Sequence, residues 1–491
     1  MKHYLILATM LGLFGASACS DSDEPEDTST DTTADAGTTK TSENKQPAAA
    51  GSPAKPTTST NAPSTDKPAQ NVPTKPAEEA EKPKDTAPTQ ETKPSDDNAA
   101  KTQQDIVGTA VAAGSFKQLA DALTKANLVD ALKGPGPFTV FAPTDAAFDA
   151  LEKAKPGTLA SLSIEQLTSV LKYHVVSGAA VKAADLKNGQ LVKTLEGPVA
   201  AIDLSGDKPK INGVTISATD VSATNGVIHV IDQVLLPPGD IIEVATAAGK
   251  FGKLAEALTS ADLVSTLKGE GPFTVFAPTD EAFAKLSAAP TGDALKNVLL
   301  YHVLKGTVGP LDLKEGGAAT TVAGSPVLFA LKDGAKINDA VISMTNVVAK
   351  NGVIHVIDSV IVPPTDDIVA TAVAAGSFTQ LAQALTSADL VSALQAPGPF
   401  TVFAPTDEAF AKLSAAPTGD ALKKVLLYHV VEGAVGSGNL VAGAVPSLLK
   451  DKSLTIDLSS GVKVNDATVT KANILTKNGI IHVIDKVLVP N

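Results

Sequence analysis

The ten residues GPFTVFAPTD occur three times in this 491-residue chain, beginning at Gly136, Gly271 and Gly398. A catalytic motif is needed once per active site, whereas a motif that builds a fold is needed once per fold. The copies lie about 130 residues apart, which is too long a period for a solenoid unit. The spacing therefore predicts three tandem domains, each with its own hydrophobic core.

Each repeat shows the same order of expected elements. Apolar residues at helical spacing come first, as in SFTQLAQAL, where Phe378, Leu381 and Leu385 share a face and Ser377 is placed to cap the helix. FTVF then alternates as a strand that stops at proline, and a second helix carries LKYHVV, LLYHVL or LLYHVV. KINGVTI and its counterparts indicate strands around tight Asn turns, and NGVIHVID or NGIIHVID indicates a closing hairpin strand. Helices first and strands later is an α+β order.

These motifs together resemble the fasciclin domain: a TVFAPTD-AF block, a central Tyr-His pair and a closing NGVIHVID block. The resemblance covers three stretches, which we expect to be domain 1 (105–238), domain 2 (239–365) and domain 3 (366–491). It implies a twisted β-sheet or wedge packed with a helical lobe, in secreted and surface-anchored proteins that mediate adhesion. Domain 1 is seven residues longer between Phe138 and Tyr173, which predicts a loop or a helix extension.

The resemblance also implies candidate ligand-binding residues. In animal members of the family, Tyr-His and Asp-Ile regions have been linked to integrin binding. The matching positions here are Tyr173, His174, Tyr301, His302, Tyr428 and His429, together with Asp105, Ile106, Asp240, Ile241, Asp367 and Ile368. The same surface could serve another ligand, or the motifs could only build the fold.

The N-terminus carries the pattern of an export signal over residues 1–19. Lys2 and His3 precede the apolar run YLILATMLGLFG, and small residues lead to Cys19, the only cysteine of the chain. This ending resembles the lipobox of bacterial lipoproteins, although Ala16 stands where that family usually has Leu. We expect Cys19 to be lipidated, with Ser20 favouring the outer membrane; an ordinary signal with an incidental cysteine is the alternative.

Residues 20–104 are rich in Thr, Ser, Pro, Ala, Lys, Asp and Glu, and Val72 is their only large aliphatic residue. Such a composition cannot bury a core, so it predicts a disordered tether. A flexible coil of this length spans roughly 50 Å, which would present the domains away from the membrane.

Composition excludes several functions. The net charge of -13 and the absence of arginine argue against a nucleic-acid partner. With one cysteine, no disulfide within the chain, no cysteine metal cluster and no catalytic thiol in the repeats is expected. We expect no cofactor and no metal site.

The repeated histidines raise an enzyme hypothesis, in which His229, His355 and His482 act as bases oriented by Asp232, Asp358 and Asp485. Residues three apart on a strand point to opposite faces, so these pairs are not expected to share a site. His174 falls on the apolar face of its predicted helix, which predicts a hydrogen-bonded core histidine.

The sequence favours a non-enzymatic, lipid-anchored surface protein whose three domains bind an extracellular protein or glycan, or another copy of the chain, by multivalent contact. Two alternatives stay open. The domains could carry a small molecule or glycan in a pocket beside the Tyr-His helix. They could also form a rigid spacer, held in line by the short linkers at Pro237-Pro238 and Pro363-Pro364.

Overall fold

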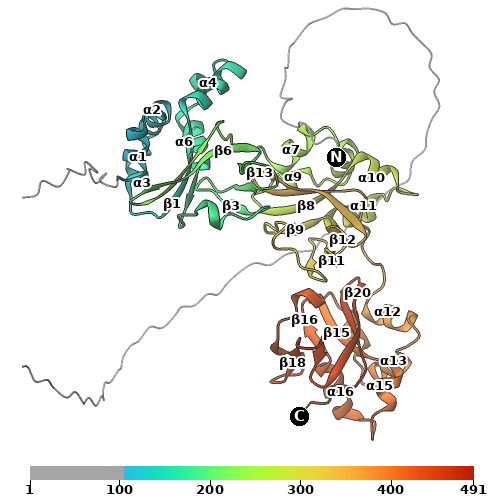
Figure 1. Cartoon of the computed structure of the whole chain (residues 1–491). Coiled ribbons are helices and arrows are strands. Elements are labelled where there is room, and N and C mark those ends of the chain that lie inside the picture. The colour runs from blue at the N-terminus through green and yellow to red at the C-terminus, as the bar shows by residue number, and fades with distance from the viewer. Residues whose placement is uncertain (1–103, 491) are drawn as a thin grey trace, which may run out of the picture. The chain divides into compact units, whose positions relative to one another are not determined.

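The computed structural model describes residues 104–490, and these residues fall in one compact unit of the chain. The predicted export signal with Cys19, residues 20–103 of the predicted tether and Asn491 lie outside the described residues. The described part contains three copies of one α+β fold, each with a seven-stranded sheet and several helices (Figure 1).

Helices come first in each copy and are followed by most of the strands. Domain 1 contains α1 (Ile106–Ala113), α2 (Lys117–Lys125), α3 (Val129–Lys133), α4 (Asp145–Ala154), α5 (Thr158–Ser161), α6 (Ile164–Tyr173) and the 3₁₀ helix η1 (Ala183–Asp185). Domain 2 contains α7 (Ile241–Ala247), α8 (Gly252–Ser260), α9 (Val264–Leu267), α10 (Asp280–Ala284) and α11 (Gly292–Tyr301). Domain 3 contains α12 (Ile368–Ala374), α13 (Thr379–Ser387), α14 (Val391–Gln395), α15 (Asp407–Ala411), α16 (Gly419–Tyr428) and the 3₁₀ helix η2 (Ser437–Asn439).

The strands recur in the same order. In domain 1 they are β1 (Phe138–Pro143), β2 (Val175–Ser177), β3 (Leu191–Lys193), β4 (Val199–Asp203), β5 (Lys210–Ile211), β6 (Val214–Ala223) and β7 (Gly226–Ile231). In domain 2 they are β8 (Phe273–Pro278), β9 (Val303–Lys305), β10 (Ala318–Thr320), β11 (Pro326–Ala330), β12 (Lys336–Ile337), β13 (Ala340–Ala349) and β14 (Gly352–Ile357). In domain 3 they are β15 (Phe400–Pro405), β16 (Val430–Glu432), β17 (Gly443–Pro446), β18 (Ser453–Asp457), β19 (Lys463–Val464), β20 (Ala467–Thr476) and β21 (Gly479–Ile484).

One pairing in each sheet is parallel and joins two repeated motifs. The sheet of domain 1 has the order β2-β1-β7-β6-β5-β4-β3, and β1 pairs with β7 in parallel register, Phe138 opposite Gly226. Phe138 also donates its backbone N–H to the carbonyl of Asn225 over 3.0 Å. A side chain at Gly136 would clash with that carbonyl, and one at Gly226 with the carbonyl of Phe138. The GPF and NG motifs therefore recur together because their backbones pack directly against each other.

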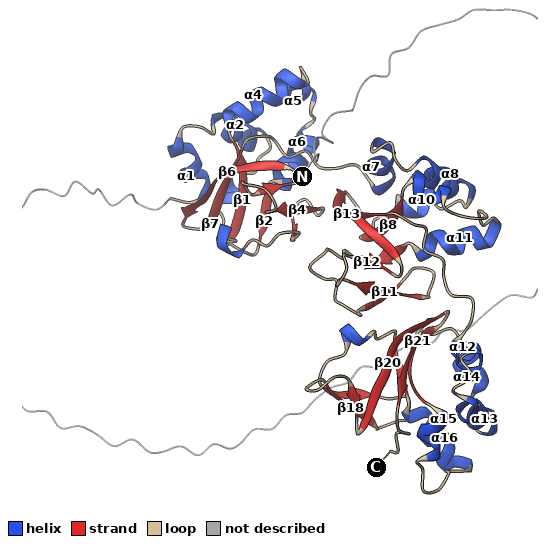
Figure 2. Ribbon diagram, turned by 45° about the vertical axis from the view of Figure 1, so that its right-hand side comes forward, coloured by secondary structure: helices blue, strands red, loops and turns tan. Residues whose placement is uncertain are grey.

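Each domain has two hydrophobic cores, one on either side of the Tyr-His position. In domain 1 the helical core gathers residues such as Phe116, Leu119 and Leu171 against the sheet, and the sheet core gathers Tyr173 and Ile211, among others. Domains 2 and 3 repeat both cores. Figure 2 shows the helices of each domain gathered against one part of its sheet.

The expected cap at Ser377 is wrong, and the structure replaces it with a contact between helices. α13 begins after Phe378, and the Asp407 carboxylate accepts from the N–H of Gln380 over 2.8 Å. Ser377 contributes its backbone carbonyl, which accepts from the N–H of Asp407 over 3.0 Å. Thr406 caps α15, leaving the neighbouring carboxylate free to cap α13. Asp145 and Asp280 make the same contact.

The second predicted helix ends earlier than expected. α6 stops at Tyr173, His174 is its C-terminal cap, and the following valines form β2. The seven additional residues of domain 1 lengthen α4 relative to α10 and add α5. Both differences leave the Tyr-His pair at the point where a helix gives way to the sheet.

Candidate functional site

The tyrosine of the Tyr-His pair lies in the sheet core. Tyr301 is fully buried, donates its hydroxyl to the Pro326 carbonyl over 2.7 Å and accepts from Nδ2 of Asn338 over 3.0 Å. Burial raises the pKa of Tyr173 and Tyr301 to about 12, so the phenol stays protonated. Tyr173 and Tyr428 have equivalent partners.

The histidine of the pair is buried and uses both ring nitrogens. Ile361 donates its backbone N–H to Nε2 of His302 over 3.1 Å, so this nitrogen carries no proton. Nδ1 therefore bears the proton and donates to the Val298 carbonyl over 2.7 Å. His174 and His429 make the same two bonds. Burial lowers the pKa of all three imidazoles to about 4.

These contacts define what the Tyr-His pairs can do in the folded domain. A general base needs a free nitrogen lone pair within reach of its substrate. His302 is 2 % exposed and its one lone pair is already engaged by a backbone N–H. In this conformation the pairs join the end of a helix to the sheet, and both rings of each pair are buried.

The histidine of the closing block is held in the opposite tautomer. His355 donates from Nε2 to the Val308 carbonyl over 2.8 Å, and its Nδ1 accepts from the N–H of Asn346 over 3.3 Å. Asp358 has different partners, including the N–H of Val341. The expectation that His355 and Asp358 face different surroundings agrees with these contacts. His229 and His482 are bonded like His355.

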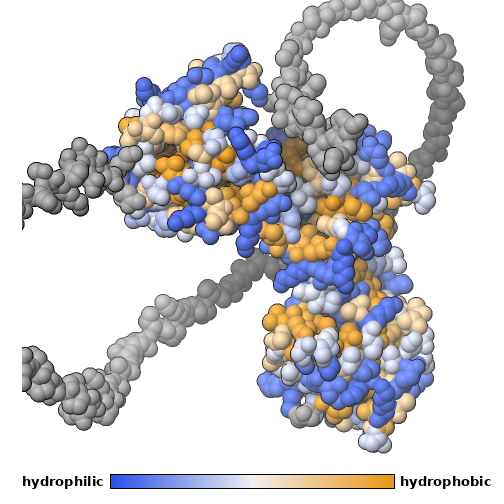
Figure 3. Space-filling model, viewed as in Figure 1, coloured by the Kyte–Doolittle hydropathy of each residue, from blue (hydrophilic) through white to orange (hydrophobic). Residues whose placement is uncertain are grey.

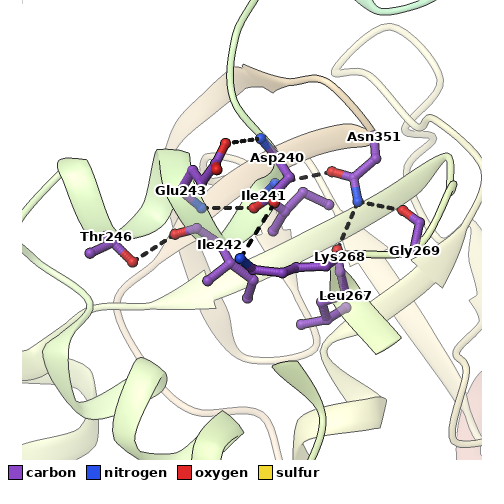
Figure 4. Close-up of polar contacts among 9 residues, drawn as sticks. All are labelled: Asp240, Ile241, Ile242, Glu243, Thr246, Leu267, Lys268, Gly269 and Asn351. Carbon is purple, nitrogen blue, oxygen red and sulfur yellow. Dashed lines mark hydrogen bonds and ion pairs between the residues drawn. The ribbon is translucent and has the colours of Figure 1, made fainter. Parts of the chain in front are cut away.

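The Asp-Ile pair lies at the start of the first helix of each domain, and Figure 4 shows the copy in domain 2. The Asp240 carboxylate caps α7 by accepting from the backbone N–H of Glu243 over 2.9 Å. In return, the Glu243 carboxylate accepts from the backbone N–H of Asp240. Lys268 Nζ lies 3.9 Å from the other carboxylate oxygen. Asp105 and Asp367 cap their helices by the same accepted bond, from the N–H of Gly108 and of Ala370, but neither of these residues has a side chain that can return a bond. These carboxylates are partly exposed, whereas Ile106, Ile241 and Ile368 are buried.

A third residue completes this site and was missed from the sequence. The Asn351 side chain accepts from the N–H of Ile241 over 3.0 Å and donates to the carbonyls of Leu267 and Gly269, each over 2.7 Å (Figure 4). It thereby ties α7 and the end of α9 to the turn before β14. Asn225 and Asn478 do the same. The only sequence signal was the recurrence of Asn before Gly, which indicates a turn equally well.

The Asp-Ile and Tyr-His pairs are not brought together into one site. Ile241 packs in the helical core of domain 2, and Tyr301 packs in the sheet core. Of these candidate residues, Asp105, Asp240 and Asp367 are the ones whose side chains reach solvent to a useful extent. A shared binding site formed by both pairs is therefore absent from the described structure.

Two hollows in domain 3 border the Tyr-His pair. An apolar cavity of about 20 Å³ between helices and sheet is lined by His429, Leu381 and Leu426, among others, which is room for about one water molecule. An open groove of about 670 Å³ is lined by Tyr428, Ser453, Asn465 and Asp466, among others.

We expect Asp240→Ala to lower the free energy of unfolding of domain 2 by about 1 kcal/mol, because the helix loses its N-cap. Asp240→Asn should cost only a few tenths of that, because asparagine caps a helix as well as aspartate does. Chemical denaturation of both variants measures the difference. Equal losses would mean that the charge facing Lys268, rather than the cap, is what matters.

Two further observations concern the part of the chain that the structure describes. Within residues 104–490, no three His, Cys, Asp or Glu side chains are grouped as a metal site. None of the helices there has the length and apolar character needed to cross a bilayer.

The fold and its buried motifs define an α+β protein made of three copies of one domain. The family model for the fasciclin domain matches residues 114–237, 249–363 and 376–490. The chain therefore belongs to the fasciclin-domain family.

Relatives come from animals and bacteria. Human periostin is 29 % identical over 402 residues, which cover 79 % of this chain and 47 % of periostin. The transforming growth factor-beta-induced protein ig-h3 of Sus scrofa is 32 % identical over 398 residues, covering 77 % of this chain and 56 % of that protein. The uncharacterized protein sll1735 of Synechocystis is 47 % identical over 133 residues, covering 27 % of this chain and 96 % of that protein. The chain thus spans about half the length of the two animal relatives.

Proposed function

We propose that the chain is an extracellular adhesion protein that presents three fasciclin domains to cell-surface or matrix ligands and is not an enzyme. The proposal rests on one observation: the side chains of the Tyr-His pair and of the closing histidine are already hydrogen-bonded within their own domain. The Tyr-His pair bonds to backbone groups of its own domain, as does the closing histidine. Binding is then left to exposed surfaces, among which the partly exposed start of the first helix is presented three times.

Among the candidate motif residues, we propose that the capping carboxylates of Asp105, Asp240 and Asp367 contact the partner. Each is only partly buried, and each sits at an equivalent helix start. Three weak contacts on one chain raise the effective concentration for the second and third binding events, so a target with repeated epitopes is held more tightly than one epitope would be. Figure 3 shows hydrophobic residues interspersed with hydrophilic ones on the visible face of the described part.

The proposal is tested by displaying the full chain on inert beads, alone and then with cells, matrix proteins or purified glycans. Clumping of the beads alone would indicate self-adhesion, and capture only with one added partner would identify the ligand class. The adhesion proposal predicts one of these two outcomes. Absence of capture with every partner would contradict it.

We further propose that Cys19 is lipidated and anchors the chain to the outer membrane or cell surface. Cys19→Ser is expected to move most of the chain from the membrane fraction to the soluble fraction, because the acylated residue is lost. Ser17→Ala is the matched control, since it keeps a small residue two positions before Cys19. Fractionation followed by immunoblotting measures both variants, and membrane retention unchanged by Cys19→Ser would contradict the anchor.

A second candidate function rests on the open groove beside Tyr428. Its lining combines an aromatic ring edge with the side chains of Ser453, Asn465 and Asp466, which are groups that hydrogen-bond sugar hydroxyls. A small-molecule or glycan ligand of domain 3 would bind there. Capture by purified glycans that is lost in Asp466→Ala, an exposed position, would favour this candidate over a protein ligand.

A further inference from the structure

The described unit contains two junctions between successive domains, and both use the same pair of surfaces. We call one of these surfaces the head of a domain. It consists of the residue with a left-handed backbone in the long strand β6, β13 or β20 and of the residue that faces it. The heads are Asp220 with Ala183 in domain 1, Asn346 with Pro310 in domain 2, and Asn473 with Ser437 in domain 3. We call the end of the loop before the edge strand, together with the start of that strand, the tail of a domain. It contains Gly189, Gly316 or Gly443.

In the first junction the tail of domain 1 meets the head of domain 2. Asn346 donates from Nδ2 to the carbonyl of Gly189 over 2.9 Å. Pro310 lies against the same glycine, so that a Cβ added at Gly189 would come within 3.3 Å of the proline ring. Gly189 and Asn346 are both half-buried as a result.

The second junction repeats this contact one domain later. Nδ2 of Asn473 donates to Oγ of Ser437 in its own domain over 2.8 Å and also lies 3.4 Å from the carbonyl of Gly316. The same carbonyl accepts from the N–H of Gly438 over 2.9 Å. Ser325 adds a bond from its hydroxyl to the Lys477 carbonyl over 2.7 Å. The amide donor of a head thus meets the glycine carbonyl of the preceding tail in both junctions.

Each head is held in place from inside its domain. The backbone N–H of Asn346 donates to the buried ring of His355, which leaves the side chain to face the neighbouring domain. Oδ1 of Asn346 is buried without a partner, because the facing residue is Pro310, which has no N–H. In domain 3, Ser437 provides this N–H to Asn473 over 2.8 Å.

The head of domain 1 differs from the other two because its side chain has no hydrogen-bond donor. Asp220 has the same left-handed backbone, with φ of 60°, and accepts from the N–H of Ala183 over 2.8 Å. An ionised carboxylate has no hydrogen to donate. Placed against a tail carbonyl, Asp220 would bring two acceptors together. Its side chain is exposed, since no domain precedes it in the described residues.

Within the described residues the tail of domain 3 is not covered by another domain, and residues 441–446 carry no charged side chain. Val441 is 70 % exposed, and residues 442–444 are exposed as well. The equivalent positions to Val441 in the other domains hold Lys187 and Lys314. β17 follows at the edge of its sheet, so its outer backbone groups are unpaired in the described structure. Sheet edges are usually protected by charged side chains, and this one is not.

We propose that the tail of domain 3, residues 441–446, docks the head of a further fasciclin domain that carries asparagine at the Asp220 position, and that Asp220 keeps a second copy of this chain from docking there. The partner class follows from the two junctions, which show what this surface accepts. The inference rests on the proposed adhesive function and names one partner for it. Its failure would leave capture of cells, matrix or glycans by the displayed chain untouched.

The test replaces Asp220 by asparagine in the full exported chain, with Cys19→Ser to keep the protein in solution. Asp220→Asn supplies the missing donor, and Asn346 and Asn473 show that asparagine fits this backbone. We expect the sedimentation coefficient of Asp220→Asn to rise with protein concentration toward assemblies of at least two chains. The parent chain should stay a monomer over the same range. Association needs high concentration, because no linker raises the effective concentration between separate chains.

Two further variants decide the cause. Asp232→Asn removes one exposed carboxylate of domain 1 away from the head and should stay monomeric. Adding Gly443→Ala to Asp220→Asn puts a Cβ on the tail where the head must approach, because a Cβ at the equivalent Gly316 would clash with the Ser437 side chain. This variant should return the chain to a monomer. The proposal is overturned if Asp220→Asn stays monomeric, if Asp232→Asn associates equally, if Gly443→Ala leaves the assemblies intact, or if the parent chain already associates through this tail.

Discussion

His302→Ala is expected to lower the free energy of unfolding of domain 2 by about 3 to 5 kcal/mol. The substitution opens a cavity between the two cores of the domain. It also leaves the N–H of Ile361 and the carbonyl of Val298 buried without their side-chain partner. Urea unfolding of the variant, followed by far-ultraviolet circular dichroism, measures the loss.

The matched control is Lys305→Ala, three residues further along and exposed at the end of β9. Exposed positions of this kind usually change stability by less than about 0.5 kcal/mol. A His302→Ala chain that folds with undiminished stability would show that the imidazole is not a structural element of the core.

Acidification is expected to destabilise all three domains between pH 6.5 and about 4, before most carboxylates are protonated. His174, His302 and His429 have an ordinary pKa of 6.5, and burial lowers it to about 4 in the folded chain. Below pH 6.5 the unfolded chain therefore binds protons that the folded chain does not bind. Stability is fully present above pH 6.5 and falls by about 1.4 kcal/mol per pH unit for each such histidine.

Summed over this window, one such histidine costs its domain about 3 kcal/mol. The pKa values of His355 and His482 are lowered by burial as well, so they act in the same direction. Urea midpoints at several pH values within the window measure the effect. Midpoints that stay constant from neutral pH to about pH 5 would contradict buried, neutral histidines.

The architecture could be predicted from the sequence because each strong signal is local and repeated. FTVF alternates over a few residues and meets proline, which cannot donate to a sheet ladder, and β1 does end at Pro143. The parallel pairing of Phe138 with Gly226 could not be predicted, because nothing in either segment specifies a partner so far along the chain. The repeated glycines at both sites become meaningful only once the two backbones are seen in contact.

The helix starts show where local patterns mislead. Ser377 has the chemistry of an N-cap, and its position before Phe378 favoured that role. The structure caps α13 with Asp407, which lies beyond a strand and reaches back to the helix start. The local preference of serine for the N-cap was overridden by the hydrogen bond between Gln380 and Asp407, which are far apart in the sequence. Patterns in a single sequence do not indicate such contacts.

The candidate site was predictable in part. Helical periodicity placed His174 on a buried face, and the structure buries it with both nitrogens bonded. The tautomer could not be predicted, because it depends on a backbone N–H sixty or so residues away, that of Leu235. Asn351 was overlooked for the same reason, since all three of its partners are distant in sequence.

The central claim is that the repeated polar motifs hold the fold and leave binding to the surface. It is tested most directly by nitrogen NMR of the imidazoles in the intact, folded chain as pH is lowered. We predict that His174, His302 and His429 are neutral with the proton on Nδ1 and stay neutral until about pH 4. We also predict that His355 and His482 are neutral with the proton on Nε2. Imidazoles of the Tyr-His pairs that titrate near pH 6.5 in the folded chain would be open to solvent and ligands, and would contradict the claim.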